Sequence, residues 1–177
     1  MRKVLIIAML YASFSAPAAA QRDDMSARVA HLKSVVHGTK HRDKFVRMSA
    51  VDAAAAIDPK RAVDVLRRSL KDNDAQVREA ASEALGTLGP TAEPAVKDLI
   101  VALSDDSDTL SFYVRESAAK TLGLIGPQAV EAIPHLERLA ANPKDKDLQS
   151  IAVKSLRHIR AQPANKSVNR SGKSGGI

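Results

Sequence analysis

Small and aliphatic side chains recur along most of this chain at steps of three and four residues. The clearest stretch lies between positions 77 and 88. Residues three and four apart share one side of an α-helix, so this stretch predicts a helix with one apolar face. Positions 114 to 125 repeat the pattern. The apolar positions of the first stretch are Val77, Ala80, Ala81, Ala84, Leu85 and Leu88.

The same spacing divides the chain into helix pairs. A Gly-Pro step follows two of the helical stretches, at positions 89–90 and 126–127, and Asp58-Pro59 follows another. Gly closes helices because it adopts positive φ angles at low cost, and Pro cannot continue them. We therefore expect three pairs flanked by single helices. The expected ranges are 26–37, the pairs 43–57 with 60–71, 74–88 with 92–104 and 111–125 with 129–141, and finally 146–161.

Each pair begins with the same short motif. The pattern V-R-x-x-A starts at Val46, Val77 and Val114, and a weaker copy without the arginine starts at Leu148. These starts lie 31, 37 and 34 residues apart, which is the length of a helix pair with its turns. Such units bury their apolar faces only by stacking on one another. The sequence therefore predicts an all-α fold, an α-α superhelix of stacked pairs.

A polar residue stands three positions before each copy of the motif. Asp and Ser side chains accept hydrogen bonds from the free N–H groups of a first helical turn. We therefore expect these residues to be the N-caps of the first helices. The four are Asp43, Asp74, Ser111 and Asp145.

The motif D-x-x-V-R-x-x-A-x-x-x-L-G-x-L-G, as it stands from Asp74 to Gly89, resembles the HEAT repeat of the variety first linked to phycobilisome lyases. The resemblance extends over about residues 40–160 and implies a short HEAT-type solenoid. It also implies that the motif arginine ties adjacent repeats through an acid in a loop. The second helix of each pair would line the concave side. The motif arginines here are Arg47, Arg78 and Arg115.

The residues themselves leave a second interpretation of these arginines open. Asp43 and Asp74 precede Arg47 and Arg78 by four positions, a spacing that allows an ion pair within one helix. Under either interpretation the arginine is structural, because a catalytic residue is needed once and a packing residue in every unit.

The second helices carry an excess of cations on their polar side, densest at Arg67 and Arg68. A plain solvated face explains this ridge equally well. Phe112 and Tyr113 are two of the few aromatic residues, and packing between repeats is the favoured interpretation of both. Arg and aromatic side chains are nevertheless frequent anchors of interfaces. The candidate partner-binding residues are Arg67, Arg68, Lys71, Lys97, Phe112, Tyr113 and Arg138.

The two ends of the chain differ from the repeats. Arg2 and Lys3 precede an apolar run too short to span a membrane, and small residues follow up to Ala20. This order predicts a signal peptide over residues 1–20, cleaved after Ala20, and hence a periplasmic or secreted protein with no membrane span after cleavage. Residues 21–162 would form the repeat domain. Residues 163–177, rich in Gly, Ser and basic residues, would form a disordered tail.

Composition indicates what the core is made of, and the net charge indicates which class of partner the domain binds. Aromatic residues make up 3% of the chain and Cys is absent, so the core must consist of Ala, Leu, Val and Ile without disulfides. The net charge is +7, from 27 basic and 20 acidic residues. The leader holds two of the basic residues and the tail three, which leaves +2 for the domain. This near balance argues against nucleic acid as the partner.

No motif for catalysis is present. The sequence has no Cys nucleophile, no G-x-S-x-G elbow and no phosphate-binding loop. HEAT-type hydroxylases bind iron through His-Glu dipeptides, and this sequence contains none. The acidic connector 104–108 resembles a calcium loop only loosely, and a solvated loop is expected. We therefore expect no catalytic residue, no cofactor and no metal site.

The sequence as a whole favours a non-catalytic scaffold or adaptor that binds a protein or peptide partner. Two alternatives remain open at this point. One is an enzyme or accessory factor of the bilin-lyase type that binds a small ligand in its groove. The other is a nucleic-acid-binding HEAT-like protein, against which the charge balance and the export signal both argue.

Overall fold

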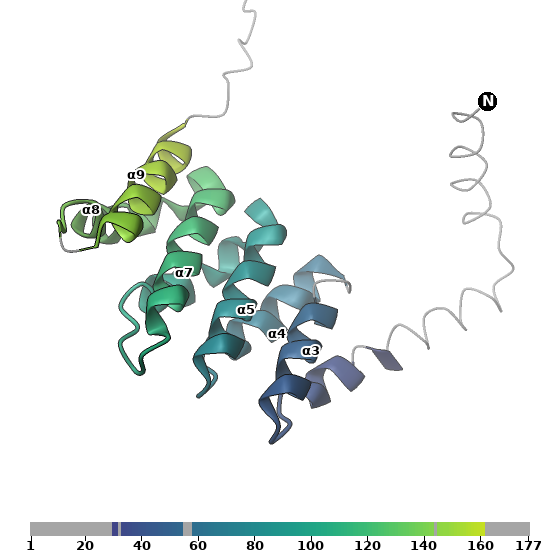
Figure 1. Cartoon of the computed structure of the whole chain (residues 1–177). Coiled ribbons are helices and arrows are strands. Elements are labelled where there is room, and N and C mark those ends of the chain that lie inside the picture. The colour runs from purple at the N-terminus through teal and green to yellow at the C-terminus, as the bar shows by residue number, and fades with distance from the viewer. Residues whose placement is uncertain (1–29, 32, 55–57, 144, 162–177) are drawn as a thin grey trace, which may run out of the picture.

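A computed structural model of the chain describes residues 30–31, 33–54, 58–143 and 145–161 (Figure 1). The predicted signal peptide and tail lie outside this range. Throughout the described part the regular structure is helical, which confirms the all-α class. None of the helices in that part is long and apolar enough to cross a bilayer.

The helices follow the predicted order. Residues 30–31 and 33–38 are helical, within or next to the predicted range 26–37. The later α-helices are α3 (Lys44–Ala54), α4 (Pro59–Ser69), α5 (Ala75–Thr87), α6 (Val96–Ala102), α7 (Ser111–Ile125), α8 (Ile133–Ala140) and α9 (Lys146–Arg160).

The structure corrects the starts of two second helices. The 3₁₀ segments η1 (Gly89–Ala95) and η2 (Gly126–Ala132) precede α6 and α8, so the α-helical parts are shorter than the predicted ranges 92–104 and 129–141. Gly89 and Gly126 have φ angles of 53° and 75°, and a Pro follows each one. Inside η1, Pro94 has no N–H to donate, so a continuous α-helical ladder cannot form there.

Three of the predicted N-caps are confirmed. Asp43 and Asp74 each accept a hydrogen bond from the backbone N–H two residues on, and Asp145 accepts one from the N–H three residues on. Each such cap contributes about 1 kcal/mol. These caps fix where the first helices begin.

The predicted cap at Ser111 is wrong. Helix α7 begins at Ser111 itself, and its N-cap is Leu110, whose side chain makes no capping bond. Asp108 accepts from the N–H of Leu110 at 2.7 Å, which fixes the connector just before the helix but does not cap its first turn. The Ser111 hydroxyl instead donates to Asp105 at 3.0 Å. The longer connector of this unit folds back over the helix start, which frees the serine for another contact.

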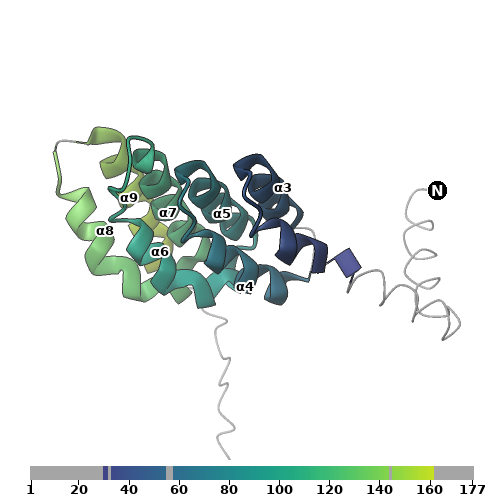
Figure 2. The same ribbon diagram turned by 90° about the horizontal axis from the view of Figure 1, so that it is seen from below.

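The helices form two layers (Figure 2). Helices α3, α5, α7 and α9 lie side by side in one layer, and α4, α6 and α8 form the other (Figure 2). One continuous apolar cluster runs between the layers from Val35 to Ile159. Leu66, Leu99 and Leu136 hold the same position in successive second helices and are fully buried. Burying a leucine contributes about 2 kcal/mol, so the stacked pairs stabilise one another.

Small residues let the first helices approach closely. The Thr121 hydroxyl of α7 donates to the carbonyl of Ser82 in α5 at 2.9 Å, within the core. On the other side of α7, a Cβ atom added to Gly123 would lie 2.9 Å from the Cα of Ser155 in α9. The distance between α7 and α9 therefore depends on the missing side chain of Gly123.

Candidate functional site

Arg47 joins the first repeat to the loop of the next. Its Nε and Nη2 atoms each donate to the Asp72 carboxylate at 2.8 Å and so form a bidentate ion pair. Its Nη1 donates to the backbone carbonyls of His41 and Arg42 at 2.9 Å. The hydrogen bond to Asp72 raises the pKa of Arg47 although burial opposes it. The side chain is buried, so the pair is shielded from solvent and screened less by salt.

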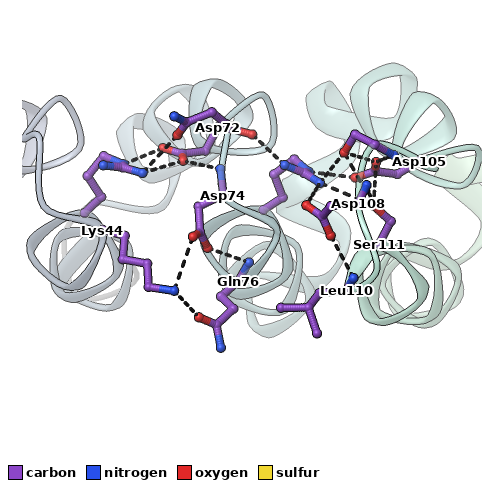
Figure 3. Close-up of polar contacts among 12 residues, drawn as sticks. Lys44, Asp72, Asp74, Gln76, Asp105, Asp108, Leu110 and Ser111 are labelled. Carbon is purple, nitrogen blue, oxygen red and sulfur yellow. Dashed lines mark hydrogen bonds and ion pairs between the residues drawn. The ribbon is translucent and has the colours of Figure 1, made fainter.

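Arg78 repeats this arrangement one unit later, with Asp105 and Asp108 in place of Asp72 (Figure 3). Its Nε donates to Asp105 at 2.6 Å and its Nη2 to the Ser107 hydroxyl at 2.6 Å. Its Nη1 donates to the backbone carbonyl of Asp72 at 2.8 Å. The loop at Asp72 is therefore held by Arg47 through the side chain and by Arg78 through the main chain.

At two junctions the motif arginine therefore pairs with an acid in the following loop, as the resemblance implied. Neither Arg47 nor Arg78 forms an ion pair with the aspartate four residues before it. Asp43 and Asp74, the alternative partners, use their side chains to cap their own helices. Asp74 also pairs with Lys44 at 3.3 Å.

Arg115 lacks the arrangement of the other two arginines. Its Nε is buried and has no hydrogen-bond partner among the residues that the structure describes. The loop position that corresponds to Asp72 and Asp105 is occupied by Asn142. An amide carries no charge, so the third junction lacks the carboxylate that Asp72 and Asp105 supply at the first and second junctions.

The connector 104–108 is more than the solvated loop that the sequence predicted. The side chain of Asp105 is only 11% exposed, and Asp108 lies 3.3 Å from Nη2 of Arg78. The extra residues of this loop therefore surround Arg78 with acceptors. Over the described ranges, no group of three or more His, Asp or Glu side chains is placed to hold a metal ion.

Three aspartates, Asp74, Asp98 and Asp105, have lowered pKa values. Burial alone would raise the pKa of Asp105, but hydrogen bonds from Ser107 and its other neighbours outweigh burial. The pKa values of Asp74 and Asp98 are lowered in the same way, against burial. A folded-state pKa below the unfolded value means stability that is present above a pH of about 4 and is lost as the pH falls through the folded pKa.

Two glutamates behave in the opposite way. Burial, followed by repulsion from Glu83 and Glu116, raises the pKa of Glu79. Burial, followed by repulsion from Asp147 and Asp145, raises the pKa of Glu116. A folded-state pKa above the unfolded value means that ionisation of the glutamate weakens the fold. The free energy of unfolding therefore falls as the pH rises from the unfolded pKa through the folded pKa.

Glu79→Gln should therefore raise the free energy of unfolding by about 0.5 kcal/mol at pH 7, the usual cost of a like-charge pair on a helix. The gain should shrink as the pH is lowered towards the unfolded glutamate pKa of about 4.3, because the wild-type carboxyl then becomes neutral as well. Urea unfolding at several pH values measures both effects, with the exposed Glu131→Gln as control. A difference that grows on acidification would contradict this assignment.

The cations of the second-helix layer divide into paired and unpaired groups. Arg67 and Lys71 both contact Asp98, at 2.7 Å and 2.9 Å. Arg68 and Lys97 are exposed, and neither side chain has a polar partner within the described residues. Arg138 lies 3.0 Å from the ring of the neighbouring His135 and donates to a carbonyl of its own helix, the one four residues back. The second helices therefore do carry an excess of cations, but among Arg67, Arg68, Lys71, Lys97 and Arg138 only Arg68 and Lys97 are without a polar partner in the described residues.

Three adjoining hollows run along the loop side of the α4 and α6 helices. The largest, here called the basic hollow, has a volume of about 560 Å³ and is lined by residues 39–42, Arg47, Arg68, Ser69 and 71–73. A second, of about 250 Å³, is lined by Asp64, Arg67, Arg68, Lys71 and Asp98. A third, of about 360 Å³, reaches Val101 and the connector 104–107. Lys71 lines all three hollows.

The structure brings only some of the candidates together. Arg67, Arg68 and Lys71 meet at the hollows, whereas Lys97, Arg138 and the two aromatic residues do not line them. Phe112 is half-buried and meets the 49% exposed Tyr113 edge to face at 5.5 Å.

Residues 39–42 were missed by the sequence interpretation. They precede the first repeat and carry no motif, so only their basic character could have drawn attention to them.

Comparison with known proteins agrees with this architecture. A family model described as HEAT repeats matches residues 29–111 and 76–157. Among solved structures, the chain is similar to the crystal structure of an engineered protein from the Northeast Structural Genomics Consortium, with 22% identity and a TM-score of 0.56. That match covers 72% of this chain and 62% of the other, and it concerns the fold alone. Among curated proteins, no sequence matches. Since the two family matches together extend over most of the chain, this protein belongs to the HEAT-repeat family.

Proposed function

We propose that this protein is an exported, non-catalytic scaffold that binds a protein partner along the α4 and α6 helices. HEAT repeats commonly mediate protein interactions, which supports the general role. The observation that carries the proposal is the row of three hollows, because it offers a partner a continuous concave surface beside exposed side chains.

The exposed residues beside the hollows support a protein rather than a small ligand as the occupant. Val101 is 74% exposed, the largest exposure among the large apolar residues described. Arg68 on the neighbouring helix α4 and Lys97, four residues before Val101 on α6, are exposed without polar partners in the described part of the chain. An interface combines apolar contact with arginine anchors in this manner.

Site-specific photocrosslinking tests the proposal in the cells that make the protein. A photoreactive amino acid at Val101 should trap a partner protein in the envelope or secreted fraction. The same residue at Val153, which is 45% exposed on α9 in the other layer, serves as the control. Adducts at neither position, or equal adducts at both, would contradict a binding face on the second helices.

The export part of the proposal rests on the sequence of residues 1–20 and has its own test. Mass spectrometry of the protein recovered outside the cytoplasm should find Gln21 as the first residue. Recovery of the uncleaved chain from the cytoplasm would refute export and leave the binding face untouched.

A further inference from the structure

We propose that the basic hollow anchors an acidic segment of the partner, a short extended stretch with neighbouring carboxylates. This inference rests on the proposed function and deepens it, since it names the chemistry that the scaffold recognises.

The charge of the lining carries the inference. Five cations line the basic hollow and a single carboxylate, Asp72, accompanies them. The charge of Asp72 is already neutralised by its bidentate ion pair with Arg47. An excess of positive charge is therefore left at the surface of a concave site, where it attracts anions.

The unpaired cations come from separate segments and meet at this site. Lys40 and Arg42 lie in the loop before α3, and Arg68 lies near the end of α4. All three are exposed, and none has a polar partner for its side chain among the described residues. Lys71 adds a fourth cation, whose side chain remains 70% exposed although it contacts Asp98. Arginine and lysine in this number match several carboxylates at once.

The neighbouring hollows distinguish an acidic peptide from a nucleic acid. Asp64 lines the second hollow and Asp106 the third, and both are exposed without a cation in contact in the described part. A strand with one negative charge at every step would meet both carboxylates. A peptide whose acidic stretch is short would avoid them, so the charge pattern favours the peptide.

Val101 indicates what should follow the acidic stretch. Arg68 stands two positions after the buried Leu66, and Val101 stands two positions after the equivalent Leu99. The two side chains therefore occupy the same place on neighbouring second helices. Packed helices lie roughly 8–10 Å apart, and an extended peptide covers about 3.3 Å per residue. We expect an aliphatic residue about three positions from the acidic stretch.

Fluorescence anisotropy with a designed peptide tests the inference on the full chain. The probe is a labelled peptide with consecutive glutamates and a leucine about three positions beyond them. Binding should be saturable and should weaken as the salt concentration rises. The double variant Arg42→Gln with Arg68→Gln should weaken binding about tenfold. Circular dichroism checks that the variant is folded, as expected for two exposed positions.

Arg61→Gln is the control for the loss of a positive charge outside the site, because it removes one charge from an exposed position of α4 that lines none of the three hollows. Its binding should equal that of the wild type. Equal weakening by Arg61→Gln, equal binding of a peptide with glutamine in place of glutamate, or full competition by millimolar inorganic phosphate would each overturn the inference. Tighter binding of a single-stranded oligonucleotide than of the peptide would also overturn it.

The outcome separates this inference from the proposed function. If photocrosslinking at Val101 traps a partner but the acidic peptide does not bind, the scaffold role stands and the acidic anchor is wrong. If neither experiment gives a signal, both are wrong.

Discussion

Replacing Arg78 with Met should lower the free energy of unfolding by about 3–5 kcal/mol, the usual cost of removing one partner from a buried ion pair. The substitution leaves the carboxylate of Asp105, 11% exposed, without its cation. It also removes the bond from Arg78 to the carbonyl of Asp72, which joins two successive loops. Urea unfolding followed by circular dichroism measures the loss. Because domains of this size are stable by only about 5–15 kcal/mol, the effect should be large.

Two further variants decide whether the ion pair is the cause. Adding Asp105→Leu to Arg78→Met should recover much of the lost stability, since the stranded charge is then gone. Arg115→Met should cost clearly less than Arg78→Met, because no carboxylate is paired with Arg115 in the described residues. An equal loss at both arginines would show that packing of the side chain, and not the charge pair, stabilises the junctions.

Gly123→Ala should cost about 2 kcal/mol, within the usual range for overpacking of a core. The new Cβ would lie 2.9 Å from the Cα of Ser155, and a main-chain atom cannot rotate away. Helices α7 and α9 would have to separate along their contact. The gain of about 1 kcal/mol from replacing glycine by alanine inside a helix only partly offsets this cost. Thermal and urea unfolding measure the net effect.

Gly86→Ala provides the comparison at the preceding junction. There the new Cβ would meet side-chain atoms, the Thr121 hydroxyl at 2.9 Å and a methyl group of Leu124 at 3.2 Å. Leu124 is 47% exposed and can turn aside, whereas the Thr121 hydroxyl would have to weaken its bond to the Ser82 carbonyl. A loss is therefore expected here too, but a smaller one than at Gly123. The reverse order of the two losses would contradict the view that contact with the main chain sets the cost.

Much of the fold could be predicted from the sequence because its determinants are local. The three- and four-residue spacing of Ala, Val and Leu, together with the caps at Asp74 and Asp145, placed the first helices to within a few residues. The HEAT resemblance identified Arg47 and Arg78 as links to a loop acid, although the acid itself could not be named. Asp72 and Asp105 lie 25 and 27 residues from their arginines, and no local pattern marks a distance of that kind.

The candidate site was predicted less completely. The spacing of the second helices pointed to Arg67, Arg68 and Lys71, which do line hollows. It could not show that Asp98 draws Arg67 and Lys71 together while Arg68 stays unpaired, because that depends on the neighbouring helix. Nor could it bring Lys40 and Arg42 to Arg68, since the loop before α3 has no repeat pattern to place it.

The sequence by itself thus determined the first helices and the order of the helices, because hydrophobic periodicity and capping act within a few residues of one another. It also predicted their stacking, since repeated units bury their apolar faces only against one another. The tertiary structure alone decided which charges neutralise one another, which remain free and where concave surface forms. Those properties depend on side chains from different repeats meeting across loops, and such distances are set only when the helices have packed.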